Sequence, residues 1–254
     1  MPAATPGAAM VMTRYLETMS VILQIETATT SCSVAIAIDG NTLAFKQVNE
    51  RNIHAEVITL FIEELITKAN LTYNDLDAIA VSCGPGSYTG LRIGVSTAKG
   101  LCFALNKPLI AVETLEAMAT GFINAANVKI DEGTLLCPMI DARRMEVYCA
   151  VFNANGEKLR ATAADIIDEN SFSELLSDNK MLFFGDGADK CKAVLGSNPN
   201  AHFYPAFENS ASHLTQKAME KFNRNEFEDV AYFEPYYLKD FIAGKKSAVN
   251  QNQA

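Results

Sequence analysis

The segment that most constrains the fold of this chain is the glycine-rich stretch 82–94, SCGPGSYTGLRIG. It follows an apolar, strand-like run and precedes a helical one, so it predicts a strand, a tight turn and a helix start. Gly84, Pro85 and Gly86 suit a sharp reversal of the backbone, and Ser87 can cap the helix that follows. Such a turn either connects two packed elements or offers free backbone N–H groups to an anion or a partner's carboxylate.

The helix expected after this turn carries a row of small residues beside its apolar face. Gly90, Gly94 and Thr97 follow one another at helical spacing. Glycine inside a helix costs about 1 kcal/mol relative to alanine, so two glycines one turn apart predict the close approach of another backbone. The neighbour is either another helix of this chain or a helix of a partner.

Composition restricts the class of protein. The chain has 254 residues, of which 49% are apolar, enough for one large domain or two small ones around a sizeable core. A formal charge of −9 argues against a nucleic-acid surface on this chain alone, because affinity for phosphates comes mainly from lysine and arginine. Six cysteines lie mostly within apolar runs and lack CxxC spacing, which favours buried thiols. With no predicted export signal or membrane span, we expect a cytoplasmic protein.

Hydrophobic patterning predicts two successive α/β units. In the first, three short β-rich runs form an antiparallel meander, and further strands then alternate with helices, as in one actin-like subdomain. The expected strands are 21–26, 32–39, 42–48, 77–82 and 109–112, and the expected helices are 52–70, one ending near 106, and 115–126. In the second unit the expected strands are 135–140, 146–152, 158–162 and 181–184, and the expected helices are 171–176, 188–195 and 210–223.

This pattern divides the chain into four parts. We expect a leader at 1–19, an N-terminal lobe at 20–126, a reduced second lobe at 127–242 and a polar tail at 243–254. The helix at 52–70 is apolar over most of its surface. It is therefore either sandwiched inside its lobe or presents a second face to another subunit.

A hydroxyl-rich loop follows the acidic residue at the end of the first strand, Glu26. In the actin-like ATPase and sugar-kinase superfamily, the corresponding hairpin carries an acidic residue and then hydroxyl residues that face nucleotide phosphates. Thr27, Thr29, Thr30 and Ser31 are accordingly candidate phosphate-facing residues, although ordinary turns have the same composition.

The sequence lacks the common catalytic and metal-binding motifs. There is no GxxxxGK[ST] loop, and none of the three histidines has an HxxxH or HExxH partner. The segment Gly86–Gly90 has the wrong spacing for a GxSxG nucleophile elbow. We therefore predict no catalytic residue, no metal ligand and no cofactor for this chain.

Several of these motifs together resemble the TsaB (YeaZ) family. The resemblance covers nearly all of 21–238 and is densest at GPGSYTGLRIG (84–94); KGL (99–101), ETL (113–115), IETA (25–28) and EPYYL (234–238) also match. It implies an α/β, actin-like (ASKHA, ribonuclease H-like) fold of two lobes, with mixed sheets flanked by helices.

The resemblance also implies a function. TsaB-like proteins are understood to be non-catalytic relatives of TsaD, which carries the metal and the transfer site. With a TsaE-like ATPase they install threonylcarbamoyl on the adenosine beside the anticodon of tRNAs that read codons beginning with A. The implied role is a scaffold for a TsaD-like subunit, with ATP and metal on partner subunits and tRNA bound only through the complex. A homodimer of the free chain is a further option.

The family resemblance places the partner-binding surface on the first two long helices. The residues expected there are His54, Val57, Ile58, Phe61, Gly90, Leu91, Gly94, Thr97 and Leu101. Two alternatives come from other classes. One is a metallopeptidase of the glycoprotease type, which the missing ligand pair disfavours. The other is a small actin-like kinase, which only the loop at 26–31 supports.

Overall fold

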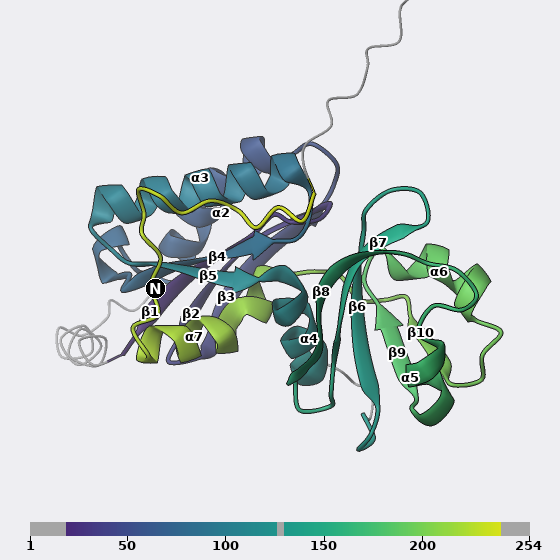
Figure 1. Cartoon of the computed structure of the whole chain (residues 1–254). Coiled ribbons are helices and arrows are strands. Elements are labelled where there is room, and N and C mark those ends of the chain that lie inside the picture. Colours follow the sequence, from purple (N-terminus) through teal and green to yellow (C-terminus); the bar gives the residue numbers. More distant parts are fainter. Residues whose placement is uncertain (1–18, 126–129, 240–254) are drawn as a thin grey trace, which may run out of the picture.

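Two five-stranded sheets form the framework of the molecule (Figure 1). The computed structural model describes residues 19–125 and 130–239, so almost all of the expected leader, the expected tail and the expected lobe boundary lie outside the described residues. The first sheet has the order β3-β2-β1-β4-β5 and consists of β1 (Val21–Glu26), β2 (Ser31–Ile38), β3 (Asn41–Asn49), β4 (Ala78–Gly84) and β5 (Leu109–Glu113). The second has the order β10-β9-β6-β7-β8 and consists of β6 (Leu135–Asp141), β7 (Glu146–Phe152), β8 (Lys158–Ile166), β9 (Met181–Phe184) and β10 (Ala201–Tyr204).

The second sheet repeats the topology of the first. In each, three consecutive strands pair antiparallel, and two later strands join parallel on the other side of the first strand. The central strand β1 is buried along its whole length, because helices cover both faces of its sheet. This duplication is the actin-like, two-lobed arrangement that the family resemblance implied, and it confirms the predicted fold class.

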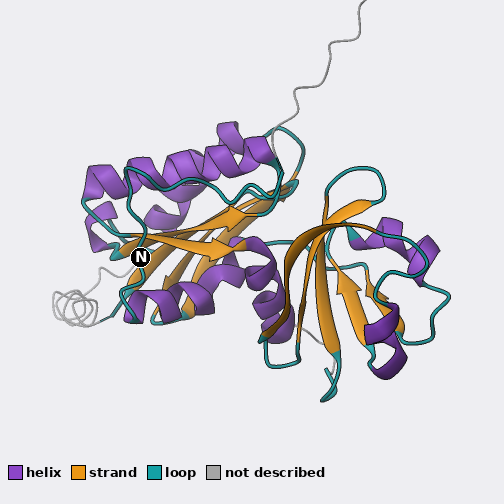
Figure 2. Cartoon of the chain, viewed as in Figure 1, coloured by secondary structure: helices purple, strands orange, loops and turns teal. Residues whose placement is uncertain are grey.

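Helices cover the sheets in layers (Figure 2). On the first sheet, α2 (His54–Lys68) and α3 (Tyr88–Leu105) lie side by side on one face and share one apolar core with the strands. The remaining helices are the short η1 (Tyr73–Asp75), α4 (Thr114–Ala125), α5 (Ser173–Asp178), α6 (Ala188–Leu195), η2 (Ala211–Leu214) and α7 (Thr215–Asn223).

Two of these helices are exchanged between the sheets. The helix α4 follows the first sheet in the chain, yet its Phe122 packs with Phe152 and Phe184 of the second. Conversely, α7 follows the second sheet, yet Ala218 packs with Ile22 and the other residues on the far face of the first. Each lobe therefore depends on a helix from the other half of the chain for part of its core.

The segment after α7 returns along the first lobe as an extended strap, residues 226–239, drawn in yellow in Figure 1. The Lys99 ammonium on α3 donates to the carbonyls of Ala231 at 3.2 Å and Phe233 at 2.9 Å. The N–H of Tyr236 donates to the Cys83 carbonyl at 2.7 Å. The strap thus fastens the motif EPYYL against the end of β4.

Most predicted elements are confirmed, several to the residue. The observed β1, β7, β9 and α6 coincide with the predicted ranges. The range 210–223 is one short 3-10 helix and a separate α-helix from Thr215, and β8 extends to Ile166. The four-residue strand β10 was not predicted, because it is short and none of its residues is fully buried, so it lacks a clear apolar or alternating pattern.

All six cysteines are free, and five of them are buried, as predicted. Among the described residues no helix is long and apolar enough to span a membrane.

A close contact between α4 and η2 provides a test of how α4 meets the segment that leads into α7. A methyl group added to Gly121 would lie 2.2 Å from Cγ of His213, whereas one added to Gly100 on α3 would meet nothing within 4 Å. We expect Gly121→Ala to lower the free energy of unfolding by roughly 1–3 kcal/mol through overpacking. Gly100→Ala is the matched control and should raise it by about 0.5–1 kcal/mol through helix propensity. Urea denaturation measures both, and equal stability of the two variants would contradict this contact.

Candidate functional site

The glycine motif lies where the first strand, α3 and the strap converge. As predicted, Ser87 caps α3, and its Oγ accepts a hydrogen bond from the Gly90 N–H at 3.2 Å. Gly84 has a φ of 121°, in the region that favours glycine. The motif therefore forms the strand, turn and helix start that the sequence indicated.

The two helical glycines face the chain's own first loop. A methyl group on Gly90 would lie 2.1 Å from the carbonyl oxygen of Thr27, and one on Gly94 would lie 2.2 Å from its Oγ1. Both glycines are buried. The neighbour that the small residues accommodate is therefore Thr27, directly after β1, and not a helix of this chain or of a partner as the sequence suggested.

This contact corrects most of the predicted partner-binding residues. Gly90 and Gly94 do not lie on a partner surface, because Thr27 of the same chain occupies the space beside them. Four further residues are also buried within the lobe, because their side of each helix faces the first sheet: His54, Ile58, Phe61 and Leu91. The Nε2 atom of His54 is 3.0 Å from the Thr29 carbonyl oxygen.

Three residues of the predicted set remain accessible. Val57, Thr97 and Leu101 are half-buried on the flanks of α2 and α3. Sequence reasoning missed the two apolar side chains that protrude furthest from these helices, Leu60 at 59% exposure and Phe103 at 86%. The missed signal is that both fall outside the buried stripes at three- and four-residue spacing.

The predicted phosphate-facing loop is largely closed. Thr27 and Ser31 are buried, so their prediction as residues that face a phosphate is wrong. Thr29 Oγ1 accepts the Ser31 N–H at 3.2 Å, and Thr30 Oγ1 donates to Oδ1 of Asn49 at 2.8 Å. The hydroxyl groups of Thr29 and Thr30 therefore hold the loop, whereas those of Thr27 and Ser31 are buried without a hydrogen-bond partner among the described residues.

An acidic residue lies fully buried beside this loop. Glu26 has no exposed surface, and its Oε1 accepts the Ala28 N–H at 2.5 Å. Burial raises the pKa of this carboxyl from 4.5 to about 7, because the ionised form loses its hydration, and the hydrogen bond from Ala28 offsets only part of the rise. Among the described residues, no group of three or more His, Cys, Asp or Glu side chains is placed to hold a metal ion.

Comparison with known proteins identifies relatives along most of the chain. The model of the TsaD family, tRNA N6-adenosine threonylcarbamoyltransferase, matches residues 48–246. The tRNA threonylcarbamoyladenosine biosynthesis protein TsaB of Escherichia coli (strain K12) is 30% identical over 236 residues, which cover 89% of this chain and 97% of that protein. A tRNA N6-adenosine threonylcarbamoyltransferase of Staphylococcus haemolyticus is 40% identical over 110 residues, covering 37% of this chain and 32% of that protein.

A solved structure has the same fold. The structure of YeaZ from Pseudomonas aeruginosa superposes with a TM-score of 0.69 and 25% identity. The superposition covers 86% of this chain and 100% of that one.

The buried carboxyl leads to a prediction about pH. Below pH 4.5 Glu26 is protonated in both states, whereas between pH 4.5 and about 7 only the unfolded chain ionises. The stability that Glu26 contributes is therefore complete below pH 4.5 and is lost as the pH rises through 7. Glu26→Gln removes this dependence. Relative to wild type, we expect the variant to gain about 3 kcal/mol of unfolding free energy across that interval.

Urea denaturation at a series of pH values measures this difference, in which the other titrating groups cancel. Glu169→Gln is a matched control, because Glu169 is exposed and lies outside the lobe core. It should run parallel to wild type, and a parallel profile for Glu26→Gln would contradict the assignment.

Proposed function

The chain belongs to the TsaB (YeaZ) family of tRNA threonylcarbamoyladenosine biosynthesis proteins, and we propose that within this modification it is a non-catalytic scaffold for a TsaD-like catalytic subunit. The proposal places ATP and metal on partner subunits, among them a TsaE-like ATPase. Transfer RNA binds only through the complex, since the formal charge of this chain is −9.

The observation that carries the scaffold proposal is the packing of the glycine motif. Glycine-rich turns that bind phosphate leave their backbone N–H groups open to the ligand. Here Gly90 and Gly94 instead receive Thr27, and the Ser87 N–H donates to the Ala28 carbonyl at 2.6 Å. The glycines of the motif thus make room for packing within the lobe. This use favours a structural role for the motif over phosphoryl transfer.

The partner surface that we propose is the outer side of α2 and α3. We call it the outer helical surface and define it by Leu60, Phe103 and the half-buried Val57, Thr97 and Leu101. Along the same side of α3, Ser96 and Gly100 are exposed and present little bulk to an approaching helix. Protruding apolar groups beside small residues suit the docking of a second helical face.

Charge on the outer helical surface also limits the partner. Glu56 and Glu63 are exposed along α2, whereas the exposed Glu64 is paired with Lys46. A partner that covers this helix is therefore expected to bring apolar side chains at the centre and basic ones around them. The free chain can use the same surface to pair with a second copy, in competition with the catalytic subunit.

Two equally exposed leucines test the proposed surface. Leu60 on α2 and Leu159 on β8 are each 59% exposed, so neither change to aspartate removes a core side chain. We expect Leu60→Asp to weaken binding of a TsaD-like subunit by at least tenfold, about 1.4 kcal/mol, and Leu159→Asp to leave it unchanged. Titration calorimetry measures both affinities, and thermal melting checks that both variants are folded. Equal affinities would place the partner elsewhere.

The non-catalytic assignment has its own test. We expect the purified chain to form no threonylcarbamoyladenosine on tRNA until a TsaD-like subunit is added, because the chain supplies a surface and no reacting group. Modification by the lone chain would contradict the proposal. Bound zinc or iron in elemental analysis would favour the metallopeptidase alternative, and phosphoryl transfer by the lone chain would favour the kinase alternative.

A further inference from the structure

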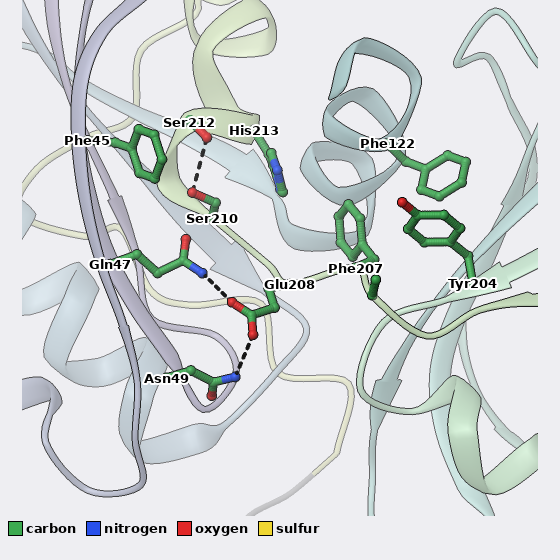
Figure 3. A pocket seen from close by; sticks show the side chains of 11 residues that line it. Phe45, Gln47, Asn49, Phe122, Tyr204, Phe207, Glu208, Ser210, Ser212 and His213 are labelled. Atoms are coloured by element: carbon green, nitrogen blue, oxygen red, sulfur yellow. Dashed lines mark hydrogen bonds between the residues drawn. The ribbon is translucent and has the colours of Figure 1, made fainter. Parts of the chain in front are cut away.

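A pocket of about 680 Å³ lies between the two lobes, away from the outer helical surface (Figure 3). Its walls come from the edge strand β3, from α4, from the end of β10 and from the following segment with η2. A volume of this size is typical of sites that hold a small organic molecule. No residue of the glycine motif lines it.

Aromatic rings form much of one side of the pocket. Phe122 contacts Tyr204 edge-on, with ring centres 5.2 Å apart, and Phe207 stacks on His213 at 5.0 Å. On the opposite wall, Phe45 projects from β3 and is 56% exposed. Phe122 is buried, so the accessible rings are those of Phe45 and the half-buried Tyr204 and Phe207. Their electron-rich faces attract a cation within about 6 Å of the ring centre.

The polar side of the pocket is centred on one carboxylate. Glu208 accepts hydrogen bonds from Nε2 of Gln47 at 3.0 Å and from Nδ2 of Asn49 at 3.4 Å. Figure 3 shows these three side chains together on the β3 side, facing the aromatic residues across the pocket. Among the described residues Glu208 forms no ion pair. The carboxylate is therefore oriented by neutral amides.

The balance of charge distinguishes between ligand classes. No lysine or arginine lines the pocket. Burial lowers the pKa of His213 to about 4, because the charged imidazolium would lose its hydration, so this ring is neutral near pH 7. Glu208 then gives the lining a net charge of −1. Such a lining repels phosphates and carboxylates and attracts cations.

We propose that this interlobe pocket binds a small organic cation with a planar, delocalised head, of the guanidinium or amidinium type. A planar head of this kind donates two parallel hydrogen bonds to a carboxylate, which the amide-held Glu208 provides. Its flat faces also stack on aromatic rings. The proposal is independent of the scaffold role, because it involves neither the outer helical surface nor the glycine motif.

Three probes of nearly the same shape isolate the role of charge. Benzamidine is the cation, benzamide the neutral analogue and benzoate the anion. We expect the full chain near pH 7 to bind benzamidine with a Kd of about 1 mM, benzamide at least threefold more weakly and benzoate not measurably. Chemical-shift titration by NMR measures all three. A fourth probe, N-acetyl-arginine methylamide, distinguishes a free aromatic cation from the arginine side chain of a polypeptide.

Two variants and a control assign the binding to this pocket. Glu208→Gln should weaken benzamidine binding by about tenfold and remove its preference over benzamide. Phe45→Leu should weaken it by about threefold, and because Phe45 is exposed the change removes no core side chain. Glu169→Gln, an exposed change outside the pocket lining, should bind as wild type does.

Four results would overturn the proposal. They are benzoate binding as tight as benzamidine, equal benzamidine affinity for wild type and Glu208→Gln, no binding of any cationic probe up to about 20 mM, and tighter binding of ATP than of benzamidine at this pocket. The last result would identify a phosphate-binding cleft.

Discussion

The close approach of α3 to the end of β1 is the contact on which the first lobe depends. Gly90 and Gly94 place the helix backbone against Thr27, closer than any side chain would allow. The helix can then cover the sheet with its apolar stripe while Thr27 and Ala28 stay buried beneath its N-terminal turn. Each glycine weakens the isolated helix by about 1 kcal/mol, and tertiary packing offsets that loss.

The contact between α3 and Thr27 also explains why the Glu26 carboxyl is buried. Because Thr27 and Ala28 are held under α3, Glu26 is removed from water, and the interactions with donors on Ala28, Ser82, Asn209 and Thr27 only partly offset this loss of hydration. A carboxyl in this setting is more readily kept neutral than ionised. The acidic position that could serve phosphate chemistry in an open loop is here part of the interior.

The exchange of α4 and α7 gives the two lobes a shared core. Phe122 and Ala218 each complete the sheet of the other half of the chain. Where η2 leads into α7, the Gly121 backbone of α4 receives the His213 ring, which also stacks on Phe207 at the interlobe pocket. The outer helical surface and the interlobe pocket therefore lie on different parts of one connected framework, so each can be altered without removing a residue of the other.

Residue type and spacing within short segments of the sequence predicted most of the secondary structure and indicated the family. Strands such as Val21–Glu26 and the Ser87 cap follow from residue type and spacing within a few positions, and GPGSYTGLRIG is specific enough to indicate the TsaB family.

Tertiary structure alone decided which face of each helix is covered. The row of Gly90 and Gly94 signals close packing but not its partner, because a backbone from β1 and a foreign helix leave the same pattern in sequence. The interlobe pocket was equally invisible, since Gln47, Phe122 and Glu208 are brought together only by the exchange of helices between two separately encoded sheets.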